Sequence, residues 1–416
     1  MRKGTDALYA GIDVGTTKVQ TLVARVGPYG ELEMVARGLV ASRGMRKGMV
    51  VSFHELGEAV RESVCQAERD LGRVLPPAYV GVTGQHISSF NTSSSLDRPE
   101  AALRPLSHRE VKEAVRAASP STKGNKKVLH LIPRAYSIDG LGGVRNPVGL
   151  CATQVDVEAH VITGDLPHLT NLARVLDSAG VAVKGLVLEP LASAEAVLTA
   201  DEREMGAVMV DVGGGTSDIA IFQEGAIWHT AVVPVAGFHF TNDVSQALRL
   251  PFSLAEEAKL RYGSAEVVTT TATDYVELGA DGAGQPRRID RNRLCDVLHS
   301  RARDLVQQIV AKLKQAGLER VPAAGIVFTG GAARLPGLVE LAADISMAPV
   351  RLGMPRESFH LPPELTSPAC ATCVGLLLWN FREPDVKTDG DLEGNGHIPL
   401  YRRVALRLGR AFSGVS

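Results

Sequence analysis

Two distant stretches of the chain share one pattern of apolar and polar positions. LYAGID leads through the turn VGTT into KVQTLVARV near the N-terminus, and VMVDVGGGT leads into SDIAIF about halfway along the chain. Short apolar runs bounded by glycine turns are typical of buried strands. Each stretch therefore predicts a strand, a tight turn and a second strand, and the repeat predicts two homologous halves that face each other.

Helical spacing separates these strand patterns. SFHELGEAVRESVCQAERDLG and DLPHLTNLARVLDSAG carry apolar residues at intervals of three and four, and Gly72 marks the expected end of the first helix. GIVFTGGAARLPGLVELA predicts a strand, a Gly-Gly turn and then a helix of roughly two or three turns. Strands and helices that alternate in this way predict an α/β fold.

The pattern of apolar and polar residues changes between about residue 85 and residue 164. SSFNTSSS is polar, SHREVKEAVRAA predicts a helix opened by a serine cap with a nearby glutamate, and HVIT resumes a strand. We expect an inserted subdomain here, made of short strands and one or two helices.

Composition narrows the function classes. The 416 residues predict two or three domains, and 45 basic against 46 acidic residues give a net charge of −1, which argues against a general nucleic-acid-binding protein. Five scattered cysteines are typical of a reduced cytoplasmic compartment. No apolar segment typical of a signal peptide follows the basic N-terminus. The longest apolar run, CVGLLLWNF, is far shorter than the roughly 18 residues of a membrane-spanning helix.

Cys370 and Cys373 form a CxxC pair. Such a pair belongs either to a metal or redox site or to a helix that places two small residues one turn apart. No second pair and no matching histidines accompany it, which favours the helix.

The glycine turns suit phosphate chemistry. A tight turn presents successive backbone N–H groups, which bind phosphate oxygens, and side chains there would block close approach. An aspartate before each turn, Asp13 or Asp211, would be repelled by phosphate and instead suits a hydrated Mg²⁺. Two such hairpins can clamp a triphosphate from both sides, with the Gly-Gly turn of the third motif at a helix N-terminus beside a ribose or α-phosphate.

Each motif alone has an ordinary explanation, as a glycine-rich hairpin or a common strand-to-helix turn. Their order and spacing together favour a nucleotide site. The chain has no GxxxxGK[ST] and no GxGxxG after a strand, which excludes a P-loop and argues against a Rossmann dinucleotide site.

The three motifs resemble the phosphate-1, phosphate-2 and adenosine signatures of the actin/Hsp70/sugar-kinase ATPase superfamily. Within it, the chain most resembles the FtsA family of bacterial cell-division proteins. The resemblance runs from residue 11 to about residue 341 and is carried, in family order, by GIDVGTTKV, SRGMRKG, VTGQHIS, VLHLIPRAYSIDG, NPVGL, HVIT, DEREMGAVMVDVGGGTSDIAIF, AEEAKLRYG and AGIVFTGGAARLPGLVELA.

The resemblance implies an actin-like two-lobed ATPase fold with a family-specific α+β insertion and a flexible C-terminal tail. The first lobe would comprise residues 1–85, with 164–200 and part of the core at 355–381. The inserted subdomain would comprise 86–163. The second lobe would comprise 201–354, with a smaller subdomain at about 230–305, followed by a flexible linker at 382–399 and an amphipathic membrane-targeting helix at 400–416.

The resemblance also implies a binding site for ATP with Mg²⁺. Asp13 and Asp211 would organise the metal's water shell. The phosphates would be held by two sets of residues, Gly15, Thr16, Thr17 and Lys18 on one side and Gly213, Gly214, Gly215 and Thr216 on the other. The ribose and adenine would lie against Gly330, Gly331 and Ala332. Glu256 and Lys259 match the adenine-side helix of the family, although ordinary charge spacing on an exposed helix explains them too.

Glu189 falls where related ATPases place the group that orients the attacking water. A carboxylate within hydrogen-bond reach of that water would act as a general base. The alternative is an acid that caps the helix PLASAEAVL. We expect at most weak ATPase activity.

A basic cluster, Arg291, Arg293, Arg301 and Arg303, lies around an expected helix start. It is either a solvated face or, as the resemblance implies, part of the site for the acidic C-terminal tail of the tubulin-like protein FtsZ. A guanidinium suits carboxylate recognition, and Arg301 together with Arg291 is the expected contact.

The C-terminal tail predicts a membrane anchor. Residues 382–399 are rich in glycine and acidic side chains and nearly free of large apolar ones, as in a flexible tether. On a helix, residues 400–416 place an apolar face opposite four arginines, which suits an interfacial helix on anionic lipids. The expected membrane contacts are Leu400, Tyr401, Arg402, Arg403, Val404, Arg407, Leu408, Arg410 and Phe412.

The resemblance, together with the basic amphipathic tail, implies an ATP-binding protein that polymerises at the inner face of the cytoplasmic membrane and tethers the FtsZ ring to it. It would be peripheral, at the division site, with FtsZ, other division proteins and further copies of itself as partners and no nucleic acid. The alternatives are a PilM-like pilus-assembly protein or a small-molecule kinase of the same fold.

Overall fold

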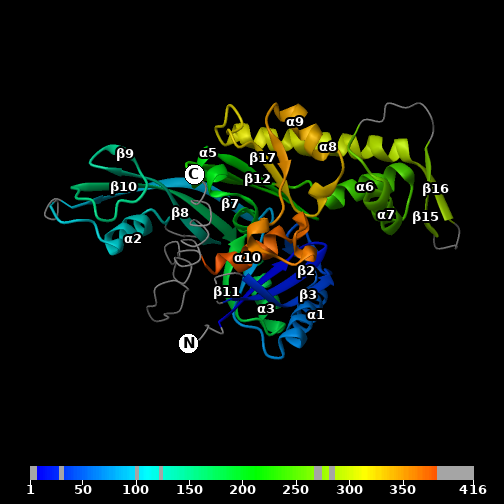
Figure 1. Cartoon of the computed structure of the whole chain (residues 1–416), viewed down its shortest axis with the longest axis horizontal. Helices are drawn as coiled ribbons and strands as arrows, with labels where there is room; N and C mark the ends of the chain where they lie inside the picture. The colour runs from blue at the N-terminus through cyan, green and yellow to red at the C-terminus, as the bar shows by residue number, and fades with distance from the viewer. Residues whose placement is uncertain are drawn as a thin grey trace, which may run out of the picture.

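The computed structural model describes residues 7–27, 32–98, 103–120, 125–266, 274–280 and 286–381. Two five-stranded sheets form its frame (Figure 1). The first has the order β11-β6-β1-β2-β3 and consists of β1 (Leu8–Val14), β2 (Lys18–Val26), β3 (Leu32–Ala41), β6 (Ala78–Val82) and β11 (Val183–Leu188). The second has the order β14-β13-β12-β17-β18 and consists of β12 (Ala207–Val212), β13 (Ser217–Gln223), β14 (Ala226–Val233), β17 (Ile326–Thr329) and β18 (Val350–Leu352).

The two sheets repeat one topology. β1, β2 and β3 pair antiparallel, as do β12, β13 and β14. β6 and β11 add to the first sheet in parallel beside β1, as β17 and β18 add to the second beside β12. The predicted pair of strand–turn–strand units is confirmed, and each unit lies at the centre of its sheet.

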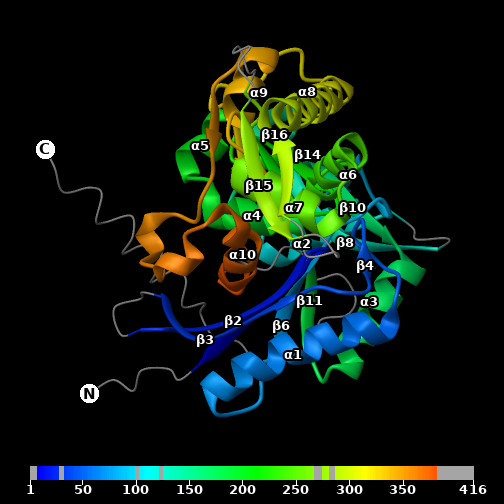
Figure 2. The ribbon, with the colours of Figure 1, turned by 90° about the vertical axis from the view of Figure 1, so that its right-hand side faces the viewer.

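Helices separate and cover the sheets (Figure 2). α1 (Phe53–Leu71) and α3 (Leu166–Ser178) cover the first sheet, and α1 ends at Gly72, as predicted. α4 (Glu189–Val197) packs on the second sheet and α10 (Ala371–Trp379) on the first, and the two helices pack on each other. One apolar core runs through this layer and joins side chains from both sheets, including Leu22 of β2 and Met209 of β12.

The contact between α4 and α10 is unusually close. A Cβ atom on Gly375 would lie 1.7 Å from the carbonyl oxygen of Ala192, so only glycine fits there. Cys373 lies within α10 and Cys370 directly before it, and both are buried free thiols. The helical interpretation of the CxxC pair is therefore confirmed.

The inserted subdomain is a four-stranded sheet with the order β7-β10-β8-β9, which projects sideways from the frame (Figure 1). Its elements are β7 (Ile87–Asp97), α2 (His108–Ala117), β8 (Lys126–Ile138), β9 (Leu141–Val144) and β10 (Gln154–Asp165). The serine cap of α2 is confirmed, since Ser107 and Glu110 form a capping box. The expectation of short strands was wrong, because β7, β8 and β10 have 11, 13 and 12 residues.

The remaining elements include a group of helices that shares one apolar core with the second sheet. The remaining α-helices and strands are α5 (Ala200–Met205), α6 (Gly237–Leu248), α7 (Phe252–Tyr262), β15 (Tyr275–Ala280), β16 (Pro286–Asp290), α8 (Arg291–Gln315) and α9 (Leu338–Ser346), with the small hairpin β4 (Met45–Arg46) and β5 (Met49–Val50) on the first lobe. α8 has 25 residues, so Arg301 and Arg303 lie in its middle and not near its start as expected.

The predicted linker and amphipathic helix, residues 382–416, lie outside the described residues. Within the described residues, every helix is too short or too polar to cross a membrane.

Candidate functional site

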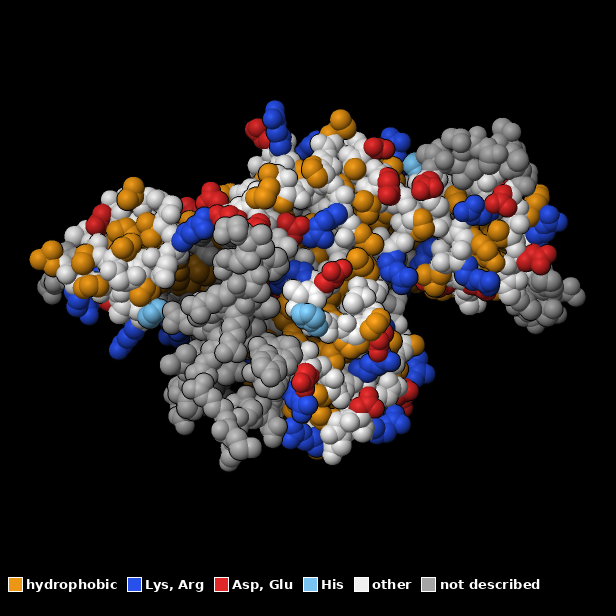
Figure 3. All heavy atoms as spheres, in the orientation of Figure 1, with side chains coloured by type: hydrophobic (Ala, Val, Ile, Leu, Met, Phe, Trp, Pro, Cys, Tyr) orange, Lys and Arg blue, Asp and Glu red, His pale blue; other side chains and the backbone are white. Residues whose placement is uncertain are grey.

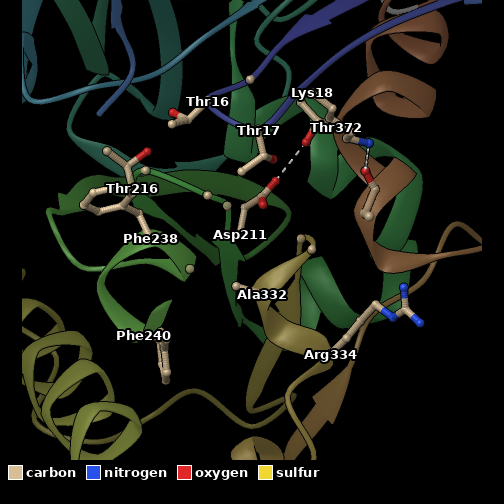
Figure 4. A pocket seen from close by; sticks show the side chains of 18 of the residues that line it. Thr16, Thr17, Lys18, Asp211, Thr216, Phe238, Phe240, Ala332, Arg334 and Thr372 are labelled. Atoms are coloured by element: carbon tan, nitrogen blue, oxygen red, sulfur yellow. Dashed lines mark hydrogen bonds between the residues drawn. The ribbon is translucent and has the colours of Figure 1, made fainter. Parts of the chain in front are cut away.

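The two glycine hairpins meet across one large pocket between the sheets, here called the central pocket. Its volume is about 980 Å³. A Cβ atom on Gly214 would lie 2.4 Å from Cγ2 of Thr17, and one on Gly215 would lie 2.5 Å from Oγ1 of Thr16. The β1–β2 turn and the β12–β13 turn therefore touch, and glycine is what lets them approach. Figure 4 shows Thr16 and Thr17 opposite Asp211 and Thr216 around this space.

The structure brings most of the predicted site residues together in the central pocket. They are Asp13, Gly15, Thr16, Thr17, Lys18, Glu189, Asp211, Gly213, Gly214, Gly215, Thr216, Glu256, Lys259, Gly330, Gly331 and Ala332. The pocket also has an apolar wall that the sequence patterns did not reveal, which includes Phe238, Phe240, Phe252 and Leu335.

The third motif closes the pocket differently from the prediction. Gly330 has a φ of +89°, and a Cβ atom there would lie 2.4 Å from Oδ1 of Asp211. The expected helix does not follow the Gly-Gly turn directly. A 3-10 turn at Ala332–Arg334 comes first, and α9 begins only at Leu338. The turn therefore presents backbone from a loop and not from the N-terminus of α9.

Four buried carboxyl groups surround the pocket floor. Burial, with Asp211 nearby and Lys18 opposing, raises the pKa of Asp13 from its usual 3.8 to about 6. Burial raises the pKa of Asp218 to about 7 despite its hydrogen bonds from Thr83 and Thr216. Burial and then the neighbouring aspartates raise the pKa of Glu189 well above its usual value. So many buried acids beside one lysine favour a cation at this place.

Hydroxyl groups fix two of these carboxylates. Asp211 Oδ2 accepts hydrogen bonds from Ser193 Oγ of α4 at 2.5 Å and from Thr372 Oγ1 of α10 at 3.0 Å. Asp218 accepts from Thr83 Oγ1 at 2.5 Å and from Thr216 Oγ1 at 2.9 Å. Sequence reasoning missed Asp218, although the alternation of β13 after Thr216 places it on the same face.

These residues fit a hydrated magnesium ion. Mg²⁺ prefers oxygen ligands and keeps several waters. Among the described residues, no three His, Cys, Asp or Glu side chains are grouped to hold a metal ion directly. Glu189 Oε1 is buried with no hydrogen-bond partner in that part of the chain, which leaves a carboxyl oxygen for water or a hydrated cation. A cation here would therefore contact the protein through its water shell.

Lys18 is tied to the loop before α10. Its ammonium group donates to Gln20 Oε1 at 2.7 Å and to the carbonyl of Ala369. Lys18 thus reaches the pocket while it links β2 to the start of α10 (Figure 4).

Glu189 is the first residue of α4 and not its cap. Leu188 holds the N-cap position, and no side chain caps the helix. The capping alternative was therefore wrong. The carboxyl group lies instead in the wall of the central pocket, within the cluster of acids.

Glu256 and Lys259 line the pocket from α7 and form an ion pair of 2.7 Å. Lys259 also donates to Thr241 Oγ1 at 2.9 Å and to the carbonyl of Gly237, the first residue of α6, at 3.5 Å. Only 12% of the Lys259 side chain is exposed, so the alternative of an ordinary exposed face was wrong for this residue.

Arg291 and Arg301 lie on α8, outside the central pocket. Arg301 donates to Asp243 Oδ2 at 2.6 Å and to Asp304 Oδ2 at 2.7 Å. Arg291 pairs with Asp274 at 3.4 Å. Both arginines therefore already pair with carboxylates of their own chain. Figure 3 shows acidic and basic side chains interspersed at the right-hand end of the molecule.

Comparison with known proteins identifies the family. A family model described as "Cell division protein FtsA" matches residues 208–375, and one described as "SHS2 domain inserted in FTSA" matches residues 84–163. The chain is 37% identical over 376 residues to the cell division protein FtsA of Pseudomonas aeruginosa, which covers 90% of each protein.

Solved structures share the fold. A "PilM-PilN type IV pilus biogenesis complex" matches 92% of this chain and 100% of the other with a TM-score of 0.63 at 16% identity. A crystal structure of "MreB5 of Spiroplasma citri bound to ADP" matches 90% and 96% with a TM-score of 0.51 at 15% identity. These likenesses show an actin-like fold. The relatives show the family as well, so the chain belongs to the FtsA family of cell-division proteins.

Proposed function

We propose that the central pocket binds ATP with Mg²⁺. The observation that carries this is the contact of two glycine hairpins, one from each sheet, across a pocket of about 980 Å³ whose floor holds buried acids. Backbone N–H groups of both turns bind the phosphates, and Asp13 and Asp211 hold the metal's water shell. The apolar wall from α6 and α7 takes the base. The fold neighbour MreB5 was solved with ADP, which supports a nucleotide here.

Calorimetric titration with Mg-ATP tests the pocket. A Gly215→Ala variant places a methyl group 2.5 Å from Oγ1 of Thr16 and 3.0 Å from Cα of Lys47. The hairpins must separate, and ATP affinity should fall at least tenfold. Gly57→Ala, whose added carbon meets only Ser178 Oγ at 3.4 Å, is the matched control. Equal affinity of Gly215→Ala and the wild type refutes the assignment of the phosphate site.

We further propose that the protein is a division-site scaffold. It polymerises on the inner face of the cytoplasmic membrane, and its residues 400–416 attach it there as an amphipathic helix. Each basic residue near an anionic surface contributes about 1 kcal/mol, so four arginines anchor a single copy loosely and a polymer firmly. The family and the basic, amphipathic sequence of the tail support this role.

Co-sedimentation with anionic liposomes tests the scaffold. Mg-ATP should increase the pelleted fraction of the full chain, and deletion of residues 400–416 should abolish pelleting. A truncated chain that still pellets refutes the anchor. A full chain that pellets equally with and without ATP refutes the link between assembly and attachment.

The scaffold role includes FtsZ as a partner. We place its acidic tail on α8 beside Arg301 and Arg291, where an incoming carboxylate would compete with Asp243 and Asp304.

Turnover of ATP, at most slow, would use Glu189 to orient the attacking water. Further division proteins complete the set of partners.

A further inference from the structure

The inserted subdomain begins beside the central pocket, because Thr83, the residue before it, lines that pocket. The chain enters it after β6 through Thr83 and leaves it through β10 into α3. The backbone N–H of Asp165 donates to the carbonyl of His86 at 3.2 Å, so the two crossings lie side by side. Three contacts at this root reach elements that carry pocket residues.

The first contact holds the start of α4. His130 of β8 is only 8% exposed, and its Nε2 accepts the backbone N–H of Leu188 at 3.1 Å. Its ring also packs edge-on against Trp379 of α10, with 5.7 Å between ring centres. A buried backbone N–H needs an acceptor, and here the insertion supplies it. The residue that follows Leu188 is Glu189.

The second contact is a small cavity that the insertion shares with the Glu189 side chain. A cavity of about 10 Å³, the room of one water molecule, is lined by Glu189, His86 and His168. Within the described part of the chain, Glu189 Oε1 and both ring nitrogens of His86 are buried without a hydrogen-bond partner. Burial, and then His168, lower the pKa of His86 to about 4, so its ring is neutral at physiological pH. Glu189 is thus part of both the central pocket and a polar cavity at the root of the insertion.

The third contact reaches the second phosphate hairpin. Thr83 Oγ1, at the entry to the insertion, donates to Asp218 Oδ1 at 2.5 Å and lies 3.3 Å from Oγ1 of Thr216. The root of the insertion therefore contacts both sheets: the first at Leu188, the last residue of β11, and the second at Asp218 of β13.

From these contacts we propose that the inserted subdomain is coupled to the central pocket through His130, which is a positioning residue for Glu189. The proposal rests on ATP binding in that pocket. A bound nucleotide that draws Glu189 and the β12–β13 hairpin together also moves Leu188, and this changes the geometry of its hydrogen bond to His130. Coupling between two binding sites is reciprocal. If bound nucleotide changes the affinity of the insertion for a partner protein by some factor, the bound partner changes the affinity for nucleotide by that same factor.

Hydrogen–deuterium exchange of the full chain, with and without Mg-ATP, tests the coupling. The peptides of interest cover residues 185–191, around Leu188, and 126–134, within β8. His130→Leu keeps apolar bulk against Trp379 but has no acceptor, while His130→Gln restores an acceptor. His108→Leu, an exposed histidine on α2 of the same subdomain, is the matched control.

In the wild type, Mg-ATP should slow exchange in both peptides. His130→Leu should speed exchange of the Leu188 amide about tenfold, because the amide loses the hydrogen bond that protects it. The same variant should abolish the response of residues 126–134 to ATP. His130→Gln should restore both, and His108→Leu should match the wild type. The proposal is overturned if the Leu and Gln variants behave alike or if residues 126–134 of the wild type ignore bound ATP.

Calorimetry separates the two possible failures. A wild type that does not bind ATP refutes the proposed function, whereas a wild type that binds ATP without any response in residues 126–134 refutes only the coupling. If His130→Leu does not fold, the wild-type response and the His130→Gln variant still decide the question.

Discussion

Replacing Asp13 by asparagine should make the empty protein more stable and the nucleotide-bound protein less so. Asp13 is buried, and its pKa rises from 3.8 to about 6 on folding, mainly through burial. A rise of about 2 corresponds to about 3 kcal/mol, since one pKa unit is worth 1.36 kcal/mol. This is the upper limit of the gain at pH 8, because the asparagine amide must also be accommodated.

The dependence on pH follows from the direction of the shift. A carboxyl whose pKa is raised by folding stays protonated longer in the folded protein, so its burial costs nothing below about pH 4. The cost accumulates as the pH rises from about 4 to about 6 and is complete above that range. Asp13→Asn should therefore raise the melting temperature by a few degrees at pH 8 and leave it nearly unchanged at pH 4.

Mg-ATP should reverse the order of stability. A ligand at 1,000 times its Kd stabilises the folded state by about 4.1 kcal/mol, which exceeds the gain of about 3 kcal/mol, and the variant loses this because it cannot hold the metal's water shell. Differential scanning fluorimetry at pH 4 and pH 8, with and without Mg-ATP, measures all four states. Asp201→Asn, at an exposed site, is the control and should show no such crossover. An Asp13→Asn gain that is equal at both pH values would refute the electrostatic argument.

Three further predictions concern other parts of the molecule. Arg301→Glu adds a third acid beside Asp243 and Asp304, so fluorescence titration with an FtsZ tail peptide should show at least tenfold weaker binding, and the exposed control Arg303→Glu a smaller loss; unchanged affinity removes this site. Glu189→Gln should lower ATP turnover at least tenfold with ATP affinity kept, and equal turnover would exclude Glu189 as the base. Gly375→Ala forces α10 away from Ala192 and should destabilise the protein by about 3 kcal/mol in urea unfolding; a wild-type midpoint would contradict that packing.

Local patterns were enough to predict the hairpins of the site. The turn after Asp13 and the turn after Asp211 are each specified by neighbouring residues: apolar strands on both sides and glycines between them. The same reasoning underestimated the length of β7. This strand lies at the edge of its sheet, and its many serines and threonines make both faces largely polar, so no apolar alternation marks it.

The groups that fix the site could not be read from local sequence. Ser193 lies 18 residues from Asp211 and Thr372 lies 161 residues away, yet both donate to the same carboxylate oxygen. His130 and Leu188 are 58 residues apart, on different sheets. The sequence around a helical hydroxyl or a strand histidine does not indicate which distant residue it will contact. These residues meet only because α4, α10 and the insertion pack together.

α10 gives the molecule a route for mechanical load. It is the last described helix, and the chain continues from it into residues 382–416. It packs on β1, which ends near Asp13, and on α4, which begins with Glu189, and its Thr372 holds Asp211. A pull on the chain beyond residue 381 would therefore act first on the helix that contacts the elements carrying these three acids, and through it on the geometry of the pocket.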